Sequence, residues 1–373
     1  MFEARDAWVL LRSGVALQQL TGVLSGGGPR LAITYLGPPS QREQCTSFLQ
    51  GPAEWRLGHL LHPDVMVVAE PLPLFHPPGD VLRYAPFLDA VLDVAPTLEA
   101  QIEAVHSKAH RRRLRKASFG DEWRWTIGEG PAALEHFYRT LHRPYLDARF
   151  GELGHPVPQA DLQHRLAHGG CVLTVTHHGE PVCGALLFDT PEGLDYDRNG
   201  FRLDSLASPV RLAERTAALE VAIFQRAMQV HARTIFFGFC RAQVDDGLFT
   251  HKRRLGCHFE PARGTGHSKL WVRPDLRPLF FSAVPLVMGP CGQFDVHVGL
   301  AHQNPPHSPI QWRARLKNLA MPSVHRAVVW TDMDAGEPRR RDFEASLRSA
   351  LSPREVVVHE CMKEGAASLA VEV

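Results

Sequence analysis

The sequence predicts an α/β fold, and three observations lead to this prediction. Short apolar runs with the alternation of β-strands recur along the chain, separated by turns that contain glycine and proline. A hairpin pattern lies at 171–188, with Gly179 in its turn. A long amphipathic helix is predicted at 208–230, and a buried strand follows it at 234–239. This order of strands and helix is typical of an α/β unit.

The N-terminal part of the chain is predicted to form short strands, at 30–36 and 65–69, punctuated by glycine–proline turns. A helix is expected next, over 97–116. Thr97 is a suitable N-cap residue, and apolar residues recur at helical spacing from Leu98 onward.

The middle of the chain is predicted to form a single α/β unit between about 120 and 273. Its longest helix has Ser208 as the expected N-cap and Pro209 in the first turn, where a missing N–H group is tolerated. The expected elements are a strand at 122–127, a helix at 131–146, hairpin strands at 171–176 and 182–188, a strand at 194–198, the helix at 208–230, and strands at 234–239 and 267–273.

The character of the sequence changes after about residue 275. Strands are predicted at 324–330 and 355–359, with a helix at 338–351 between them. We therefore expect three parts, namely residues 1–100, 101–273, and an accessory α/β region at 274–373.

Net charge and apolar content bear on two classes of function, nucleic-acid binding and membrane insertion. The formal net charge is +1, so binding to nucleic acid would need a local basic patch. No apolar run approaches the roughly 20 residues of a membrane span, and no signal peptide is indicated at the N-terminus. These features predict a cytoplasmic protein.

Neither the cysteines nor the histidines predict a metal site. The 7 cysteines are scattered and form no Cys-x-x-Cys pair, so no disulfide framework or cysteine zinc site is expected. His106 and His110, like His164 and His168, have the i, i+4 spacing that can chelate zinc. Because no third ligand accompanies either pair, we expect surface histidines and no metal.

Several motifs resemble the GNAT superfamily of acyltransferases, in particular its FemAB-like branch, over about residues 95–262. No single motif is exclusive, and the resemblance depends on their order. The motifs are a helix with a basic tail at 106–116, an aromatic and arginine stretch at 137–142 and 149–151, a hairpin with Gly179 and Gly184, the Ser208-Pro209 helix start, and Asp246-Gly247-Leu248-Phe249 followed by Lys252 and Leu255-Gly256.

The resemblance implies a mixed, largely antiparallel sheet flanked by helices, with a partial GNAT-like half at 1–100. It also implies N-acyl transfer from an activated donor such as acyl-CoA to an amine on a small molecule or peptide. One departure concerns the donor, because Arg202 to Pro209 lacks the glycine-rich loop that holds the CoA pyrophosphate in the superfamily. Two alternatives remain open: transfer from aminoacyl-tRNA, and a non-catalytic binding module on the same fold.

Three residues are the catalytic candidates under this resemblance. Lys252 would stabilise the oxyanion or a donor phosphate, and the alternative is an exposed lysine on a short helix. Asp245 would accept the proton of the amine, and Arg198 would position a carbonyl or carboxylate. The alternatives are that Asp245 is an aspartate of a turn and that Arg198 is an arginine on an edge strand.

Other residues are binding candidates. The expected substrate contacts are Tyr145, Arg149, Tyr196, Asn199 and Asp246, although Asp246 also suits a turn before Gly247. The expected donor contacts at the start of the long helix are Ser208 and Arg211. The basic run Lys108 to Lys116 would contact tRNA phosphates if tRNA is the donor, and it is otherwise a solvated helix end.

Overall fold

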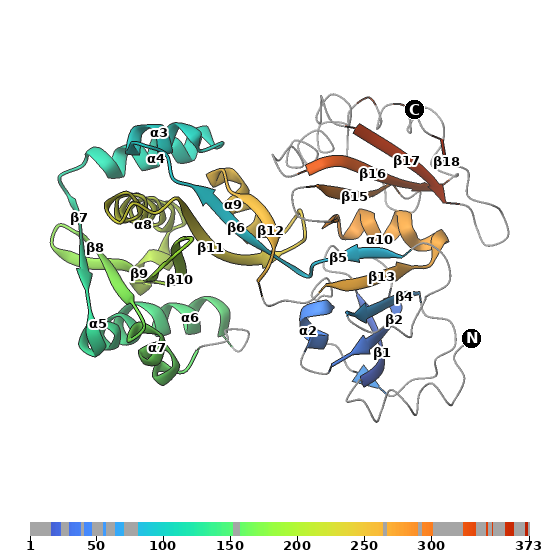
Figure 1. Ribbon diagram of the computed structural model, residues 1–373, viewed down its shortest axis with the longest axis horizontal. Coiled ribbons are helices and arrows are strands. Elements are labelled where there is room, and N and C mark those ends of the chain that lie inside the picture. The colour runs from blue at the N-terminus through green and yellow to red at the C-terminus, as the bar shows by residue number, and fades with distance from the viewer. Residues whose placement is uncertain are drawn as a thin grey trace. The chain divides into compact units, whose positions relative to one another are not determined.

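The computed structural model describes residues 16–23, 30–38, 41–46, 55–56, 64–70, 81–151, 157–263, 267–289, 293–300, 324–332, 341, 345, 355–361 and 370–371 (Figure 1). The chain divides into two compact units. Unit 1 comprises Met1–Asp89, Phe239–Thr250 and Phe259–Val373, and unit 2 comprises Ala90–Gly238 and His251–His258. The division into 1–100, 101–273 and 274–373 stays a prediction.

Two sheets belong to unit 1. The order of the first is β3-β1-β2-β4-β13-β5, and that of the second is β14-β15-β16-β17-β18. The strands of the first are β1 Ala16–Val23, β2 Arg30–Gly37, β3 Trp55–Arg56, β4 Val65–Ala69, β5 Leu82–Tyr84 and β13 Ser268–Val272. Those of the second are β14 Leu286–Met288, β15 Phe294–Leu300, β16 Val324–Asp332, β17 Glu355–Cys361 and β18 Ala370–Val371.

A shared apolar core joins the two sheets of unit 1. Helix α10, Arg277–Ala283, lies between them, and its Phe280 and Phe281 are fully buried in this core (Figure 1). Phe281 stacks on Trp330 of β16 with ring centroids 5.8 Å apart. The short helix α2, Arg42–Cys45, contributes Cys45 to the same core.

The third sheet is mixed and has the order β12-β6-β11-β10-β9-β8-β7. The pairs β7–β8, β8–β9 and β9–β10 are antiparallel, whereas β10 and β11 are parallel. The expectation of a mixed, largely antiparallel sheet flanked by helices is confirmed. Its strands are β6 Phe87–Asp93, β7 Trp123–Gly128, β8 Gly170–His177, β9 Glu180–Thr190, β10 Gly193–Phe201, β11 Thr234–Arg241 and β12 His258–Pro261.

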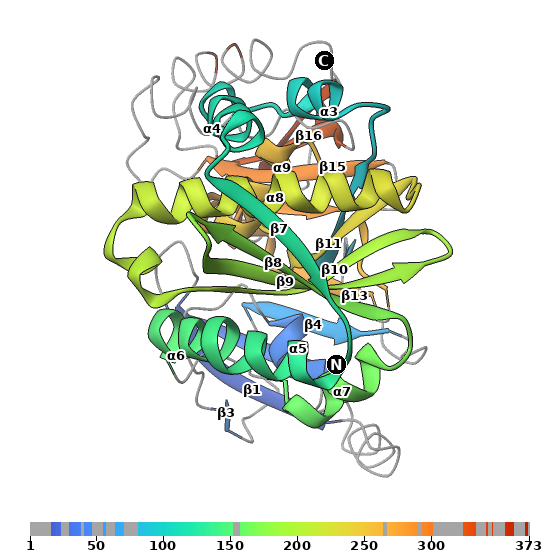
Figure 2. The ribbon, with the colours of Figure 1, turned by 90° about the vertical axis from the view of Figure 1, so that its left-hand side faces the viewer.

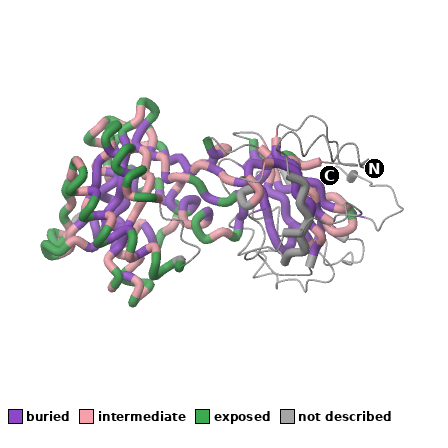
Figure 3. The backbone as a smooth tube through the Cα atoms, turned by 90° about the horizontal axis from the view of Figure 1, so that it is seen from below, coloured by how far each residue is buried: buried purple, intermediate pink, exposed green. Residues whose placement is uncertain are grey.

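Helices cover both faces of this sheet in unit 2. Figure 2 shows α3, α4 and α8 on one face and α5, α6 and α7 on the other. Figure 3 shows that buried residues gather in the interior of the described chain and that exposed ones lie along its outer turns. The helices are α3 Leu98–Ala104, α4 Lys108–Phe119, α5 Gly130–Phe137, α6 Arg143–Phe150, α7 Gln159–Leu166 and α8 Pro209–Gln229, and α9, Gly247–Leu255, runs from unit 1 into unit 2.

Most predicted elements are confirmed, with two differences in the helices. The helix expected at 97–116 is two helices, because the chain turns at Val105 and Ser107 supplies a second N-cap whose Oγ accepts from the amide of His110. The helix expected at 131–146 contains a π-helical turn, Tyr138–His142, between α5 and α6. The helix predicted at 338–351 lies almost entirely outside the described residues.

Candidate active site

The strands β10 and β11 separate near the middle of the unit 2 sheet. Their parallel pairing consists of two residue pairs, and it ends after Asp195 and Phe236. At the same level β10 has a bulge between Tyr196 and Arg198, seen as a shift of register against β9. Bulges re-aim side chains and end strand pairing, and they are common beside active sites. Five of the predicted site residues lie on or beside this bulge or on the helix next to it.

Tyr196 and Asn199 are brought together by the bulge. The Asn199 side-chain amide donates a hydrogen bond to the Tyr196 hydroxyl over 2.7 Å. The Tyr196 ring packs edge-on against Phe237 of β11, with centroids 5.5 Å apart. Burial raises the pKa of the Tyr196 hydroxyl, so this group stays neutral and can still donate its proton in a hydrogen bond.

Tyr145 and Arg149 form a second pair, on α6. Arg149 donates to the Tyr145 hydroxyl over 2.6 Å, and its guanidinium lies 5.6 Å from the centre of the tyrosine ring. Tyr145 is buried against Phe201 at the end of β10, with ring centroids 5.1 Å apart. Tyr145 therefore fixes α6 to β10, while Arg149 remains exposed. A substrate role for either residue stays a prediction.

Arg198 lies at the bulge beside an acidic neighbour. Its Nε is 3.7 Å from a carboxylate oxygen of Asp197, and the same carboxylate accepts a hydrogen bond from Arg165 of α7 over 3.0 Å. The Arg198 side chain is about one-third exposed at 34%. Within the described part of the chain, its Nε is buried and donates no hydrogen bond. Arg198 is thus a cation with spare donor capacity next to the strand separation.

His142 was not predicted from the sequence, yet it contacts the bulge directly. Its Nδ1 donates to the main-chain carbonyl of Asn199 over 2.6 Å. That bond makes Nδ1 the protonated nitrogen, and Nε2 is a buried acceptor that makes no hydrogen bond to any described residue. Burial lowers the pKa of His142, so its ring is neutral. Gly200 permits this approach, since a Cβ there would lie 2.5 Å from the His142 amide nitrogen.

Lys252 lies in the interior of unit 2, and the alternative of an exposed lysine is therefore wrong. Its side chain donates a hydrogen bond to the Gly238 carbonyl over 2.8 Å, and the residue is only 4% exposed. Gly238 has a φ of +68°, a conformation that glycine adopts readily. Lys252 thus holds the backbone of β11 just past the point where that strand leaves β10. The catalytic role of Lys252 stays a prediction.

A buried carboxylate connects three helices beside Lys252. Glu220 of α8 lies between His110 of α4, at 2.5 Å, and His251 of α9, at 3.0 Å. His110 is buried, so its prediction as a surface histidine is wrong. The sequence feature that could have indicated this buried cluster is Glu220, the one charged residue in the apolar stretch from Ala217 to Phe224.

A carboxylate also organises the start of α8. Asp204 pairs with Arg215 at 2.5 Å, with Arg202 at 3.0 Å and with Arg211 at 3.5 Å. Ser208 caps α8, as expected, and its Oγ accepts from the Arg211 amide over 3.5 Å. The Arg211 side chain is half exposed, at 50%, and so retains an open face. Donor binding by Ser208 and Arg211 stays a prediction.

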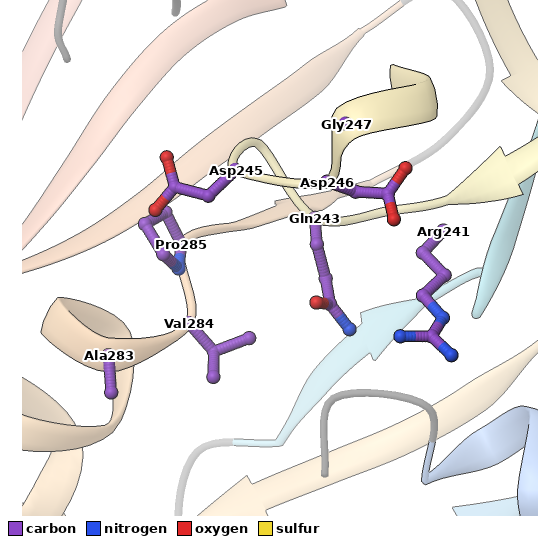
Figure 4. Close-up of a pocket in the computed structure, with 8 residues that line it drawn as sticks. All are labelled: Arg241, Gln243, Asp245, Asp246, Gly247, Ala283, Val284 and Pro285. Atoms are coloured by element: carbon purple, nitrogen blue, oxygen red, sulfur yellow. The ribbon is translucent and has the colours of Figure 1, made fainter. Parts of the chain in front are cut away.

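The two predicted aspartates lie in unit 1. Asp246 caps α9, because its Oδ1 accepts from the amides of Leu248 and Phe249, both over 2.9 Å. This geometry is that of the turn role considered for Asp246. Figure 4 shows Asp245 and Asp246 turned to opposite sides of the loop. Both line a hollow of about 250 Å³ together with Arg241, Gln243, Gly247, Ala283, Val284 and Pro285.

The basic run forms much of α4, and its side chains have different surroundings. Arg111 donates to the Val105 carbonyl, Arg115 pairs with Glu103, and Lys116 pairs with Glu214 at 3.0 Å. Lys108 and Arg112 are exposed. The run is therefore partly neutralised by its own neighbours, which reduces the charge available to a polyanion. None of the helices in the described residues has the length and apolar character needed to cross a membrane.

Comparison with known proteins supplies structural likenesses only. No protein-family model matches the chain, and no curated protein matches it. Among solved structures, FemX is 9% identical, covering 72% of this chain and 91% of its own, with a TM-score of 0.38. The C-terminal domain (DUF2156) of a putative lysylphosphatidylglycerol synthetase from Agrobacterium fabrum is 14% identical, covering 70% and 85%, with a TM-score of 0.36.

A third similar structure is a tandem GNAT protein from the clavulanic acid biosynthesis pathway. It is 12% identical, covers 70% of this chain and 83% of its own, and has a TM-score of 0.29. TM-scores and identities this low carry no conclusion about activity or substrate. The chain resembles FemX and this tandem GNAT protein, each at low identity.

Proposed function

We propose that this protein is an N-acyltransferase that moves an acyl group from an activated donor to an amine. The observation that supports this most strongly is the separation of β10 and β11 at the bulge. Two strands that part in this way can present main-chain donors and acceptors to the amide and carbonyl groups of an inserted donor molecule, as they would to an added strand. The neutral tyrosine and the partly exposed Arg198 lie on the edge of that opening.

The reaction would proceed by direct transfer. The amine nitrogen of the acceptor loses a proton to a carboxylate or to water and attacks the carbonyl carbon of the donor. A new C–N bond forms, and the C–S or C–O bond to the donor breaks. The thiolate or alkoxide leaves and takes up a proton. A fixed positive charge would lower the energy of the tetrahedral intermediate, and Lys252 and Arg198 are our candidates for it.

Acyl-CoA is the proposed donor, with its phosphates near the start of α8. Ser208 and the half-exposed Arg211 lie there, although Asp204 competes for the arginine. The glycine-rich pyrophosphate loop is missing, and Pro209 offers no amide proton. Donor binding should therefore depend on the Arg211 side chain more than on main-chain amides.

A donor-binding screen by calorimetry and thermal shift tests the proposal. The donors are acetyl-CoA, longer acyl-CoAs and charged tRNA, each at two salt concentrations. Saturable binding of one donor class supports the proposal. Failure of every donor would contradict it and favour a binding module without catalysis.

Aminoacyl-tRNA is the second candidate donor, favoured by exposed Lys108 and Arg112 on α4. Phosphate contacts make binding weaken as salt rises. Binding of tRNA alone, weakened by salt and by Lys108→Gln with Arg112→Gln, would assign the protein to aminoacyl transfer. Binding that is unchanged in this double variant would remove α4 from tRNA contact.

A further inference from the structure

Three side chains with metal-ligating atoms converge at one end of the edge strand of the unit 2 sheet. They are Glu122, just before β7, His177 at the end of β8, and His178 in the turn between β8 and β9. One ligand atom from each lies within 4.8 Å of the other two. This group lies on the β7 side of the sheet, where the order of strands ends.

The backbone explains why two adjacent histidines can face the same point. Successive side chains of an extended strand point to opposite faces of the sheet, so His177 and His178 in a regular strand would diverge. Here His178 has a φ of +51° and Gly179 a φ of +84°, as in a type I′ hairpin turn. The turn brings the two imidazole rings to 4.3 Å between centroids.

The third ligand is fixed to the same turn by the main chain. The amide of His178 donates to the carbonyl of Glu122 over 3.0 Å, next to the β7–β8 pair of Trp123 and His177. The His177 ring packs on the Trp123 indole at 4.3 Å, which limits its rotation. His177 Nε2 already lies 3.3 Å from a Glu122 carboxylate oxygen. Three ligands are therefore held on two neighbouring segments before any ion binds.

The donor set suits zinc. Two imidazole nitrogens and one carboxylate oxygen are a combination that Zn²⁺ takes in tetrahedral sites, with a water in the fourth position. In a tetrahedral site, the Zn–N and Zn–O bond lengths place any two ligand atoms roughly 3.5 Å apart. Small side-chain rotations bring the present atoms to that spacing, since Glu122 and His178 are exposed and His177 is one-third exposed.

We propose that Glu122, His177 and His178 form a three-ligand Zn²⁺ site, with water completing the coordination. The bound ion would join the start of β7 to the β8–β9 turn and so stabilise this edge of the sheet. The site is separate from the β10–β11 opening, and it does not depend on acyl transfer.

Titration of the full chain with ZnCl₂ by calorimetry, after treatment with a chelator, tests the site. The His178→Asn variant is the sharpest probe, because asparagine adopts positive φ readily and so keeps the turn while the imidazole is lost. Glu122→Gln keeps the size of the third ligand and removes its charge. Each variant should weaken binding of one Zn²⁺ by at least about tenfold.

The matched control is the histidine pair on α7. His164 and His168 have ring centroids 4.6 Å apart, and no carboxylate completes a three-ligand group with them among the described residues. His164→Gln should leave the strongest Zn²⁺ site unchanged. Equal weakening by His164→Gln, or unchanged binding in both His178→Asn and Glu122→Gln, would overturn the proposal.

Stability supplies a second measurement. An ion that binds only the folded protein raises the unfolding midpoint, so Zn²⁺ should raise it in the parent protein and less in His178→Asn. Co²⁺ as a probe should give the strong visible absorption of a four-coordinate site. An equal rise of the midpoint in the parent and in His178→Asn would show that Zn²⁺ acts elsewhere.

Discussion

The Lys252 ammonium group donates a hydrogen bond to the main-chain carbonyl of Gly238, 2.8 Å away, in the interior of unit 2. The bond links α9 to β11 where β11 has already separated from β10. The lysine is therefore in a position to control the opening between the two strands, whether or not its charge contacts a substrate.

Replacing Lys252 by Met tests this relationship. Methionine keeps the apolar stem and leaves the Gly238 carbonyl without this donor, which should lower the free energy of unfolding by about 1–3 kcal/mol. We expect turnover to fall at least tenfold when it is measured well below the unfolding midpoint. Lys252→Arg, which keeps the charge, is the matched variant. If folded Lys252→Met turns over at the parent rate, Lys252 has no part in the mechanism.

Glu220 should make stability depend on pH in two directions. Burial disfavours its charge, yet the hydrogen bonds from His110 and His251 outweigh burial and lower the pKa of Glu220 to about 2. Its contribution is present above the unfolded value near 4.5 and is lost as the pH falls toward 2. At His251, burial lowers the pKa, but the hydrogen bond to Glu220 outweighs burial and raises it. The contribution of His251 to stability is therefore present below pH 6.5 and is lost as the pH rises through its pKa in the folded protein.

Unfolding midpoints across pH 2–9 measure both effects. Glu220→Gln should lower the free energy of unfolding by about 3 kcal/mol near pH 5.5, because it removes one partner of a buried charged cluster. His251→Gln should cost less, since its side chain is 41% exposed, and its deficit should shrink as the pH rises through the raised pKa of His251. A His251→Gln deficit that is constant with pH would show that His251 is not charged in the folded protein.

Arg211 and Asp204 give a test of the donor site. Arg211→Gln removes a half-exposed cation at the start of α8 and should weaken acyl-CoA binding about tenfold with little effect on stability. Asp204→Asn should instead lower the free energy of unfolding, because it leaves the buried Arg215 without its carboxylate. Calorimetry and thermal unfolding of both variants distinguish donor binding by Arg211 from stabilisation of the fold by Asp204. Unchanged donor affinity in Arg211→Gln would place the phosphates elsewhere.

Local sequence signals predicted much of the fold. Ser208 and Pro209 mark the start of α8, and Gly179 marks the β8–β9 turn, because caps and turns depend on a few neighbouring residues. The bulge at Tyr196 could not be predicted, since a bulge is defined by the register of two strands. His110 was placed wrongly for the same reason: its partner Glu220 is 110 residues away in the sequence.

Gly200 should be among the least replaceable residues of unit 2. A Cβ at this position would lie 2.5 Å from the His142 amide nitrogen and 2.5 Å from the Leu141 carbonyl carbon, both main-chain atoms that side-chain rotation cannot move. Gly200→Ala must therefore push the π-helical turn away from β10. We expect a loss of about 1–3 kcal/mol in the free energy of unfolding.

The same variant tests whether the π-helical turn shapes the site. Moving His142 away would break its bond to the Asn199 carbonyl and disturb the bulge that carries Tyr196. Turnover should then fall further than stability alone explains. Gly247→Ala is the control, because no described atom outside its chain neighbours and its own helix lies within 4 Å of a Cβ there, and alanine favours the helix. Thermal unfolding of both variants, and their turnover at a temperature where each is folded, test this expectation. Parent-like values in Gly200→Ala would contradict the close packing of this turn on β10.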